Sequence, residues 1–350
     1  MSNPLLDVLK TQHSSHRTPV WLMRQAGRYL PEYRQLRKSF GGFLEMALDA
    51  DAACEITLQP LKRFDLDAAI IFSDILMVPY GLGQSLEFIE GQGPHLGDLN
   101  LQNLTLDNLL EKVSPTLKAL ELVAQKLPQD KTLIGFAGAP WTIMAYMIQG
   151  KSSRDFEDAL NYVYAHEDQF LKLQELIVQA TVMYLVAQVK AGAQVVQLFD
   201  SWSGFVSQNL WQNLVLDPTQ RIVAAFKKEC PNTPFIWFPK GIGSRLSNFP
   251  QGIDGISLDQ YTDLSIFAQH APKGLVWQGG LDPAALRAGG SVLVKSLDSL
   301  FNSVQGQPYI FNLGHGMTPD IPVEHVEELI QWIRQREERE CHKKPLSSSI

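Results

Sequence analysis

Eight short apolar runs constrain the fold of this chain more than any other feature of its sequence. Stretches with helical spacing separate most of them, and the runs cover residues 20–23, 68–72, 132–136, 193–199, 235–238, 255–258, 275–278 and 309–312. Continuous apolar runs of this length are typical of strands buried on both faces of a parallel sheet. Their number and their alternation with helices predict an α/β fold, namely a TIM-type (β/α)8 barrel.

A doubly wound α/β sheet is the main alternative, because its strands have the same apolar character. The length of 350 residues fits one large domain or two smaller ones. Since no linker rich in Ser, Gly or Pro divides the chain, we expect a single domain over 1–350. Residues 1–18 would form an N-terminal extension, and the charged residues 334–350 would form a frayed tail.

Two further segments carry expectations about local structure. Residues 43–64 have helical spacing, and Pro60 predicts a kink in that helix. Residues 77–94 are rich in glycine and predict an excursion from the barrel, such as a surface hairpin.

Residues 17–38 form a basic island on an acidic protein. They include five Arg and one Lys against one Glu, whereas the whole chain has a net charge of −7. Nucleic-acid-binding proteins are more often basic overall, so the island predicts a small ligand with several negative charges. Arg24 and Arg28 follow the first run, and Gly27 permits a backbone turn between them. An isolated pair is usually a surface ion pair, but this position favours binding of carboxylate or phosphate.

Asp74 follows the second run, in the apolar sequence FSDILMV. A helix N-cap is the ordinary role of an Asp at such a position. The apolar surroundings are unusual for a simple cap, and they suit a carboxylate that binds a cation or several N–H donors. The sequence leaves both readings open.

Ser201, His315 and Tyr146 are further candidates for ligand contacts. Ser201 follows the fourth run but lacks the GxSxG pattern of a hydrolase nucleophile, so an N-cap or a hydrogen bond to a ligand is expected. His315 lies between two glycines that would let a ligand approach closely, with a loop histidine of no special role as the alternative. Tyr146 lies on an apolar helix face, where core packing is the ordinary role.

The sequence also bears on cofactors and location. Cys54, Cys230 and Cys341 are far apart, which argues against a disulfide framework or a structural zinc site and favours a reducing cytosol. The N-terminus lacks the long apolar core of a signal peptide, and polar residues interrupt the best apolar stretch, 170–189. We therefore predict a soluble cytoplasmic protein that does not span a membrane. No motif points to a nicotinamide, a flavin or a catalytic metal.

Five motifs together resemble one enzyme family. They are MRQAGRYLPEYR (23–34), FSDIL (72–76), GFAGAPWTIMAYMIQG (135–150), FDSWSG (199–204) and NLGHG (312–316). In this order, and across essentially the whole chain, they resemble the uroporphyrinogen decarboxylases of haem and chlorophyll biosynthesis. The first motif is highly specific.

The resemblance implies an activity and a set of site residues. A member of this family is a homodimeric one-domain barrel that converts uroporphyrinogen III to coproporphyrinogen III by removing four acetate carboxyls, without cofactor or metal. The resemblance makes Asp74, Arg24 and Arg28 the catalytic residues. It places substrate binding on Arg24, Gln25, Ala26, Gly27, Arg28, Asp74, Tyr146, Ser201 and His315.

The implied chemistry agrees with the charge pattern. The substrate carries eight carboxylates, and the two arginines would bind and orient it through them. It also carries four pyrrole N–H groups, and Asp74 would accept hydrogen bonds from all four. A protonated pyrrole can take up the electrons left by CO2, and the Asp74 anion would stabilise that cation. An arginine, with a pKa above about 12, is a poor proton donor, so the donor stays open.

Two rival functions remain at this stage. Corrinoid-dependent methyltransferases related to the decarboxylases share the fold, but they would need Cys and His ligands for zinc, and Cys54, Cys230 and Cys341 show no such spacing. A non-catalytic carrier or sensor of tetrapyrroles would use the same pocket. Retention of both arginines and of Asp74 favours catalysis.

Overall fold

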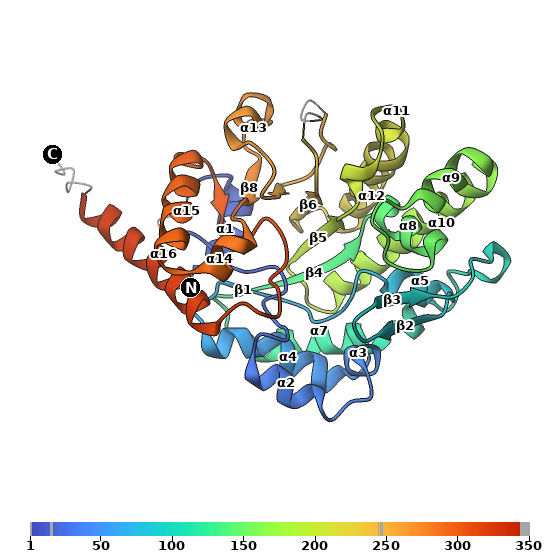
Figure 1. The fold of residues 1–350 in the computed structure, drawn as a ribbon, viewed down its shortest axis with the longest axis horizontal. Helices are drawn as coiled ribbons and strands as arrows, with labels where there is room; N and C mark the ends of the chain where they lie inside the picture. The colour runs from blue at the N-terminus through green and yellow to red at the C-terminus, as the bar shows by residue number, and fades with distance from the viewer. Residues whose placement is uncertain (1, 15–16, 244, 246–247, 344–350) are drawn as a thin grey trace.

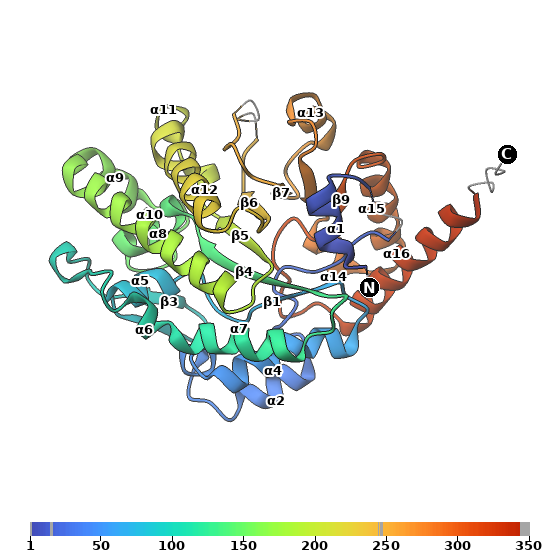
Figure 2. The same cartoon turned by 180° about the vertical axis from the view of Figure 1, so that it is seen from behind.

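The computed structural model describes residues 2–14, 17–243, 245 and 248–343. Seven parallel strands form one curled sheet, and helices cover its outer side (Figures 1 and 2). In sheet order the strands are β1 (Ala68–Ile70), β4 (Thr132–Gly138), β5 (Val195–Asp200), β6 (Phe235–Pro239), β7 (Gly255–Leu258), β8 (Val276–Gly279) and β9 (Tyr309–Ile310). Sequence neighbours are sheet neighbours throughout, as a TIM-type barrel requires. The predicted fold class is confirmed.

The remaining run, 20–23, joins the two edges of this sheet without forming a regular strand. Val20 bridges to Phe311, next to β9, where Phe311 N donates to Pro19 O over 2.8 Å. On the other side, Asp67 N, just before β1, donates to Val20 O over 2.8 Å. A turn closed by Gln25 N and Leu22 O begins at once, so the first predicted strand is reduced to one bridging residue.

Helices fill the connections between strands. Before β1 come α1 (Pro4–Thr11), α2 (Pro31–Arg37), α3 (Phe43–Ala47) and α4 (Ala50–Arg63). Between β1 and β5 lie α5 (Met77–Leu82), α6 (Leu109–Lys112), α7 (Ser114–Lys126), α8 (Pro140–Gln149), α9 (Glu157–Ala165) and α10 (Glu167–Lys190). After β5 come α11 (Gln208–Trp211), α12 (Asp217–Glu229), α13 (Leu264–His270), α14 (Pro283–Ala288), α15 (Gly290–Ser303) and α16 (Val323–Lys343).

The N-terminal extension covers the end of the barrel where the strands begin. Asn3 caps α1 and accepts a hydrogen bond of 2.5 Å from Thr132, the first residue of β4. Leu9 is buried against Gly255, the first residue of β7. Figure 2 shows α1 beside β9. Because this end is covered, the opposite end is the one left for a ligand.

Two local expectations have different outcomes. The segment 86–96 is a hairpin of β2 (Leu86–Ile89) and β3 (Gly93–Leu96), as predicted, although α5 precedes it. The helix expected over 43–64 is interrupted at Asp49, which caps α4 through Ala52 N, while Pro60 stays inside α4.

The expected frayed tail is wrong for residues 334–343, which belong to α16. Arg334 anchors this helix through ion pairs with Asp65 and Asp67, and it also pairs with Glu337 one turn further along α16. The first residue of the charged segment is thus tied to carboxylates at the base of the barrel. Residues 344–350 lie outside the described part of the chain.

Helix α10 bears on the membrane question. It is the one helix in the described ranges with the length and apolar composition of a membrane span, and half of that stretch is buried inside the fold. It packs against α8, α12 and β4. These contacts explain its apolar composition as that of a core helix.

Candidate active site

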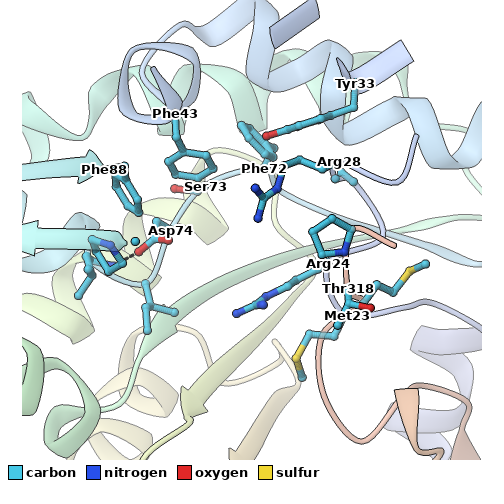
Figure 3. Close-up of a pocket in the computed structure, with 18 of the residues that line it drawn as sticks. Met23, Arg24, Arg28, Tyr33, Phe43, Phe72, Ser73, Asp74, Phe88 and Thr318 are labelled. Carbon is cyan, nitrogen blue, oxygen red and sulfur yellow. Dashed lines mark hydrogen bonds between the residues drawn. The ribbon is translucent and has the colours of Figure 1, made fainter. Parts of the chain in front are cut away.

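A cavity of about 640 Å3 opens at the end of the barrel where the strands finish. Its walls come from the loop after residue 23, the ends of β1, β4 and β5, the hairpin, and the loop after β9 (Figure 3). Of the predicted site residues, eight line this cavity: Arg24, Ala26, Gly27, Arg28, Asp74, Tyr146, Ser201 and His315. Segments far apart in sequence are thus brought to one face, as expected for this fold.

Gln25 is the predicted site residue that does not line the cavity. Its side chain is fully buried, accepts a hydrogen bond of 3.0 Å from Leu22 N and donates one of 3.0 Å to Ala68 O on β1. Its carbonyl oxygen also accepts from Tyr29 Oη over 2.8 Å. The geometry gives this side chain the task of fixing the arginine loop to the barrel.

Arg24 has a left-handed backbone, with a φ of 64°, which is uncommon for a residue with a side chain. Its side chain runs across Gly316, where an added Cβ would lie 2.4 Å from Arg24 Cδ. An added Cβ on Gly314 would similarly meet the backbone of Gln260 at 2.3 Å. The glycines around His315 therefore make room for neighbouring protein atoms, which corrects the expectation that they make room for a ligand.

The arginines of the basic island divide into two groups. Arg17 pairs with Asp65 and Asp67 at the base of the barrel, and Arg34 donates to the carbonyl groups of residues 28 and 29. Arg24, Arg28 and Arg37 line the cavity. Among the described residues, no carboxylate lies within 4.0 Å of Arg24 or Arg28, so the reading as a surface ion pair does not hold. Figure 3 shows both guanidinium groups extending into the cavity.

Asp74 lies across the cavity from Arg28 (Figure 3). Its Oδ1 accepts a hydrogen bond of 2.9 Å from Leu76 N, while no hydrogen bond reaches Oδ2 from the residues that the structure describes. Burial raises the pKa of this carboxyl, against the opposing effects of Leu76 N–H and of Arg24. One oxygen thus closes an Asx turn and the other is left for a ligand. The helix N-cap reading is wrong, because the N-cap of α5 is Leu76.

His315 is a neutral imidazole at physiological pH. Burial lowers its pKa to about 3, and the positive charges of Lys240 and Arg24 add to this effect. The ring lies 6.4 Å from that of Phe238 on β6. A neutral imidazole can donate one hydrogen bond and accept another, but it is not a charged anchor for carboxylates.

Tyr146 and Ser201 lie on the side of β4 and β5. The Tyr146 ring packs edge-on against Phe156 and Trp202, and burial raises its pKa, so its hydroxyl stays protonated. Ser201 is not an N-cap, because the short helix after β5 begins at Ser203 with Trp202 as its cap. Both side chains face the same cavity as the arginines.

The sequence interpretation missed the aromatic wall of the cavity and Arg37. The rings are Tyr33, Phe43, Phe72, Phe88, Phe136 and Phe199. Phe43 connects the wall across elements, because its ring lies 5.3 Å from Phe72 and 4.6 Å from Phe88 in the hairpin. Residues 72, 136 and 199 are each the last residue of a predicted apolar run, and that shared position is the signal that would have identified them.

The described residues contain no group of three or more His, Cys, Asp or Glu side chains placed to hold a metal ion. Cys54 and Cys230 are buried and free, and the side chain of Cys341 lies outside what the structure describes. The zinc ligands that the methyltransferase alternative needs are thus not assembled from these described side chains.

Comparisons with known proteins agree on one family. The family model for uroporphyrinogen decarboxylase matches residues 2–336. A uroporphyrinogen decarboxylase of Novosphingobium aromaticivorans is 42% identical over 339 residues, covering 95% of this chain and 99% of the relative. One from Sphingopyxis alaskensis is 45% identical over 322 residues, covering 91% and 94%. Among solved structures, a methyltransferase from Methanosarcina mazei matches with a TM-score of 0.78 at 17% identity, covering 95% of this chain and 98% of that one. At that identity the match shows the fold alone.

Proposed function

The chain belongs to the uroporphyrinogen decarboxylase family, and on that basis we propose roles for the residues of its cavity. Its reaction is the decarboxylation of uroporphyrinogen in porphyrin biosynthesis. We propose that Asp74 is the central catalytic carboxylate and that Arg24 and Arg28 bind carboxylates of the substrate.

One observation carries this proposal. Two guanidinium groups without a carboxylate within 4.0 Å among the described residues face Asp74 across one cavity. A ligand that satisfies both sides needs anionic groups at its edge and N–H donors at its centre. The macrocycle of uroporphyrinogen, with carboxylates outside and pyrrole N–H groups inside, has this arrangement. A simple carboxylic acid or phosphate would meet the arginines but leave Asp74 unsatisfied.

The proposed chemistry uses the pyrrole ring as its own electron acceptor. A proton adds to a ring carbon and makes the ring cationic; the bond to the acetate carboxyl then breaks, CO2 leaves, and its electron pair enters the ring. A proton at the former methylene carbon completes the methyl group, and loss of the first proton from the ring carbon restores the neutral pyrrole. The Asp74 carboxylate, close to the pyrrole nitrogens, stabilises the cationic ring more than the neutral substrate and so lowers the barrier.

The remaining residues are proposed to hold the substrate. Tyr146, Ser201 and His315 offer hydrogen bonds from the far side of the cavity, and Ala26 and Gly27 present loop backbone to it. The aromatic wall, with ring distances of 4.6 to 5.8 Å between Tyr33, Phe43, Phe72 and Phe88, supplies apolar contact for a macrocycle. We further propose a one-domain homodimer that acts in the cytoplasm on uroporphyrinogen III, without cofactor, metal, nucleic acid or membrane.

The test replaces Asp74 with Asn, which keeps the shape and removes the negative charge. We expect anaerobic turnover of uroporphyrinogen III to fall about 10²- to 10³-fold, as for other preorganised electrostatic groups. The assay resolves products with seven, six, five and four carboxyls. Asp98→Asn, at an exposed site, is the matched control and should keep wild-type turnover. Near-normal decarboxylation by Asp74→Asn would refute the central role of this carboxylate.

A further inference from the structure

Lys240 is a cation beside the cavity that the roles above do not use. It directly follows β6, and Lys240 N donates to Asp200 O over 3.0 Å. The register of β5 and β6 pairs Asp200 with Pro239, so Lys240 is the neighbour of Ser201, which lines the cavity.

Strand geometry places the Lys240 side chain on the cavity side. Side chains two residues apart in a strand point to the same face. Phe238, two residues before Lys240, packs against Phe199 at 5.8 Å and His315 at 6.4 Å, and both of these line the cavity. Lys240 itself is not part of the cavity wall; it lies at the edge, next to Ser201.

The charge of Lys240 is not neutralised by a neighbouring carboxylate. Its Nζ lies 5.6 Å from the centre of the Trp202 ring, and no carboxylate of the described residues lies within 4.0 Å of it. Asp259, the acid that acts on it electrostatically, already accepts hydrogen bonds from Gly241 N, Tyr261 N and Thr262 Oγ1. Partial burial lowers the pKa of Lys240, as expected for a cation without a close anionic partner.

The order of the sheet places the end of β6 opposite the start of the arginine loop. Counting the bridging residue Val20 as the first position, β6 is fifth of eight, half-way round the barrel. Arg28, which follows the first position, therefore faces carboxylates on one side of a macrocycle and Lys240 faces the other. A substrate with carboxylates around its whole edge needs cations on both sides.

We propose that Lys240 binds a side-chain carboxylate of the substrate on the side opposite Arg28. This inference rests on the proposed function, because it takes the substrate's ring of carboxylates from it. The contact is made to the edge of the macrocycle and does not involve the reacting carbon. Lys240 is accordingly expected to affect substrate binding more than the chemical step.

The experiment compares Lys240→Met with Lys240→Arg under anaerobic conditions. For Lys240→Met we expect KM for uroporphyrinogen III to rise about tenfold with kcat within about threefold of wild type. Lys240→Arg, which keeps the positive charge, should have a KM near that of wild type. Lys228→Met removes an exposed lysine of α12 and should have the KM and kcat of wild type.

Two results would overturn the proposal: an unchanged KM for Lys240→Met, or a loss of kcat alone. A lower unfolding temperature with no change in KM would mean a structural role and would also overturn it. The two proposals can fail separately. The catalytic role of Asp74 is tested by the turnover of Asp74→Asn, whereas the binding role of Lys240 is tested by the KM of Lys240→Met.

Discussion

The position of Arg24 shows how a single residue of this site is held. Its left-handed backbone and the space above Gly316 direct the side chain toward Asp74, whose pKa it lowers in part, and toward His315. A strained backbone of this kind persists only where surrounding contacts hold it in place. Gln25 supplies those contacts through its hydrogen bonds to Leu22 and Ala68.

Arg28 offers a direct test of carboxylate recognition. Arg28→Lys keeps the charge but removes the two-pronged geometry, so we expect binding of uroporphyrinogen III to weaken about tenfold. Substrates with fewer carboxylates should be affected less. KM values for the eight-carboxyl and five-carboxyl porphyrinogens measure this difference. Arg154→Lys, at an exposed site, is the control, and equal losses for the two substrates would contradict the role as a carboxylate clamp.

The pKa shifts of Asp74 and His315 assign the acidic limb of the pH profile to Asp74. The reaction needs Asp74 ionised, and burial raises its pKa, so kcat/KM should fall on acidification at a pH above the usual carboxyl value of about 3.9. The pKa of His315 is about 3, so this residue does not titrate in that range. His315→Gln should therefore lower the rate without moving the acidic limb of the profile. A shift of the acidic limb in the His315→Gln variant would show that His315, and not Asp74, is the group that titrates there.

At the scale of elements, the barrel has its shortest ladder where Val20 joins the residues next to β1 and β9. Only one residue of the 20–23 run bridges to the sheet, and side chains supplement this short ladder. Asp67 Oδ2 accepts from Val20 N at 2.8 Å and from Arg334 at 2.7 Å, and Oδ1 accepts from Arg17 at 2.8 Å. One buried carboxylate thus connects the N-terminal segment, the sheet and α16.

Removing that carboxylate should destabilise the whole barrel. For Asp67→Ala we expect a loss of about 3–5 kcal/mol in the free energy of unfolding, because two arginines lose a buried partner. Denaturant unfolding followed by circular dichroism measures this. Asp65→Ala removes a half-exposed carboxylate that contacts the same arginines, and it should cost no more than about 1 kcal/mol. Equal losses would show that burial of Asp67 is not decisive.

Most strands of the barrel were predictable from sequence because they are buried along their whole length. The runs at 132–136 and 255–258 read as apolar and became β4 and β7 with every residue buried. The tail was not predictable, because α16 is held by ion pairs with residues more than 260 positions away in sequence. The break at Asp49 was equally hidden, since Pro60 was the stronger local signal.

The site was predictable where a motif and a strand end coincide. Arg24, Asp74 and Ser201 satisfy both conditions, and all three line the cavity. Gln25 lies in the same motif but points into the structure, which sequence order alone does not show. Lys240 was missed because its importance comes from the register of two strands and from the lack of a close anionic partner.

At the scale of the whole molecule, two carboxylates in the interior oppose folding when they are ionised. Burial raises the pKa of Asp74, and it raises that of Asp200 to about 7. Asp74 faces the cavity, where N–H donors of a bound ligand can offset the free-energy cost of burying its charge. Asp200 is fully buried behind it; Thr142 Oγ1 donates to its Oδ1 over 2.6 Å, and its Oδ2 has no partner among the described residues.

Asp200 therefore predicts how stability depends on pH. Its folded pKa of about 7 lies above the value of about 3.9 expected in the unfolded chain, so the folded state holds an extra proton between these values. The contribution of protonated Asp200 to the free energy of unfolding is fully present below about pH 4 and is lost as the pH rises through about 7. Asp200→Asn imitates the protonated form and should be more stable than wild type by roughly 1–3 kcal/mol at pH 8, with a smaller difference at pH 5. Thermal unfolding at the two pH values measures this against the control Asp98→Asn; a gain that is equal at both would show that Asp200 does not titrate in this range.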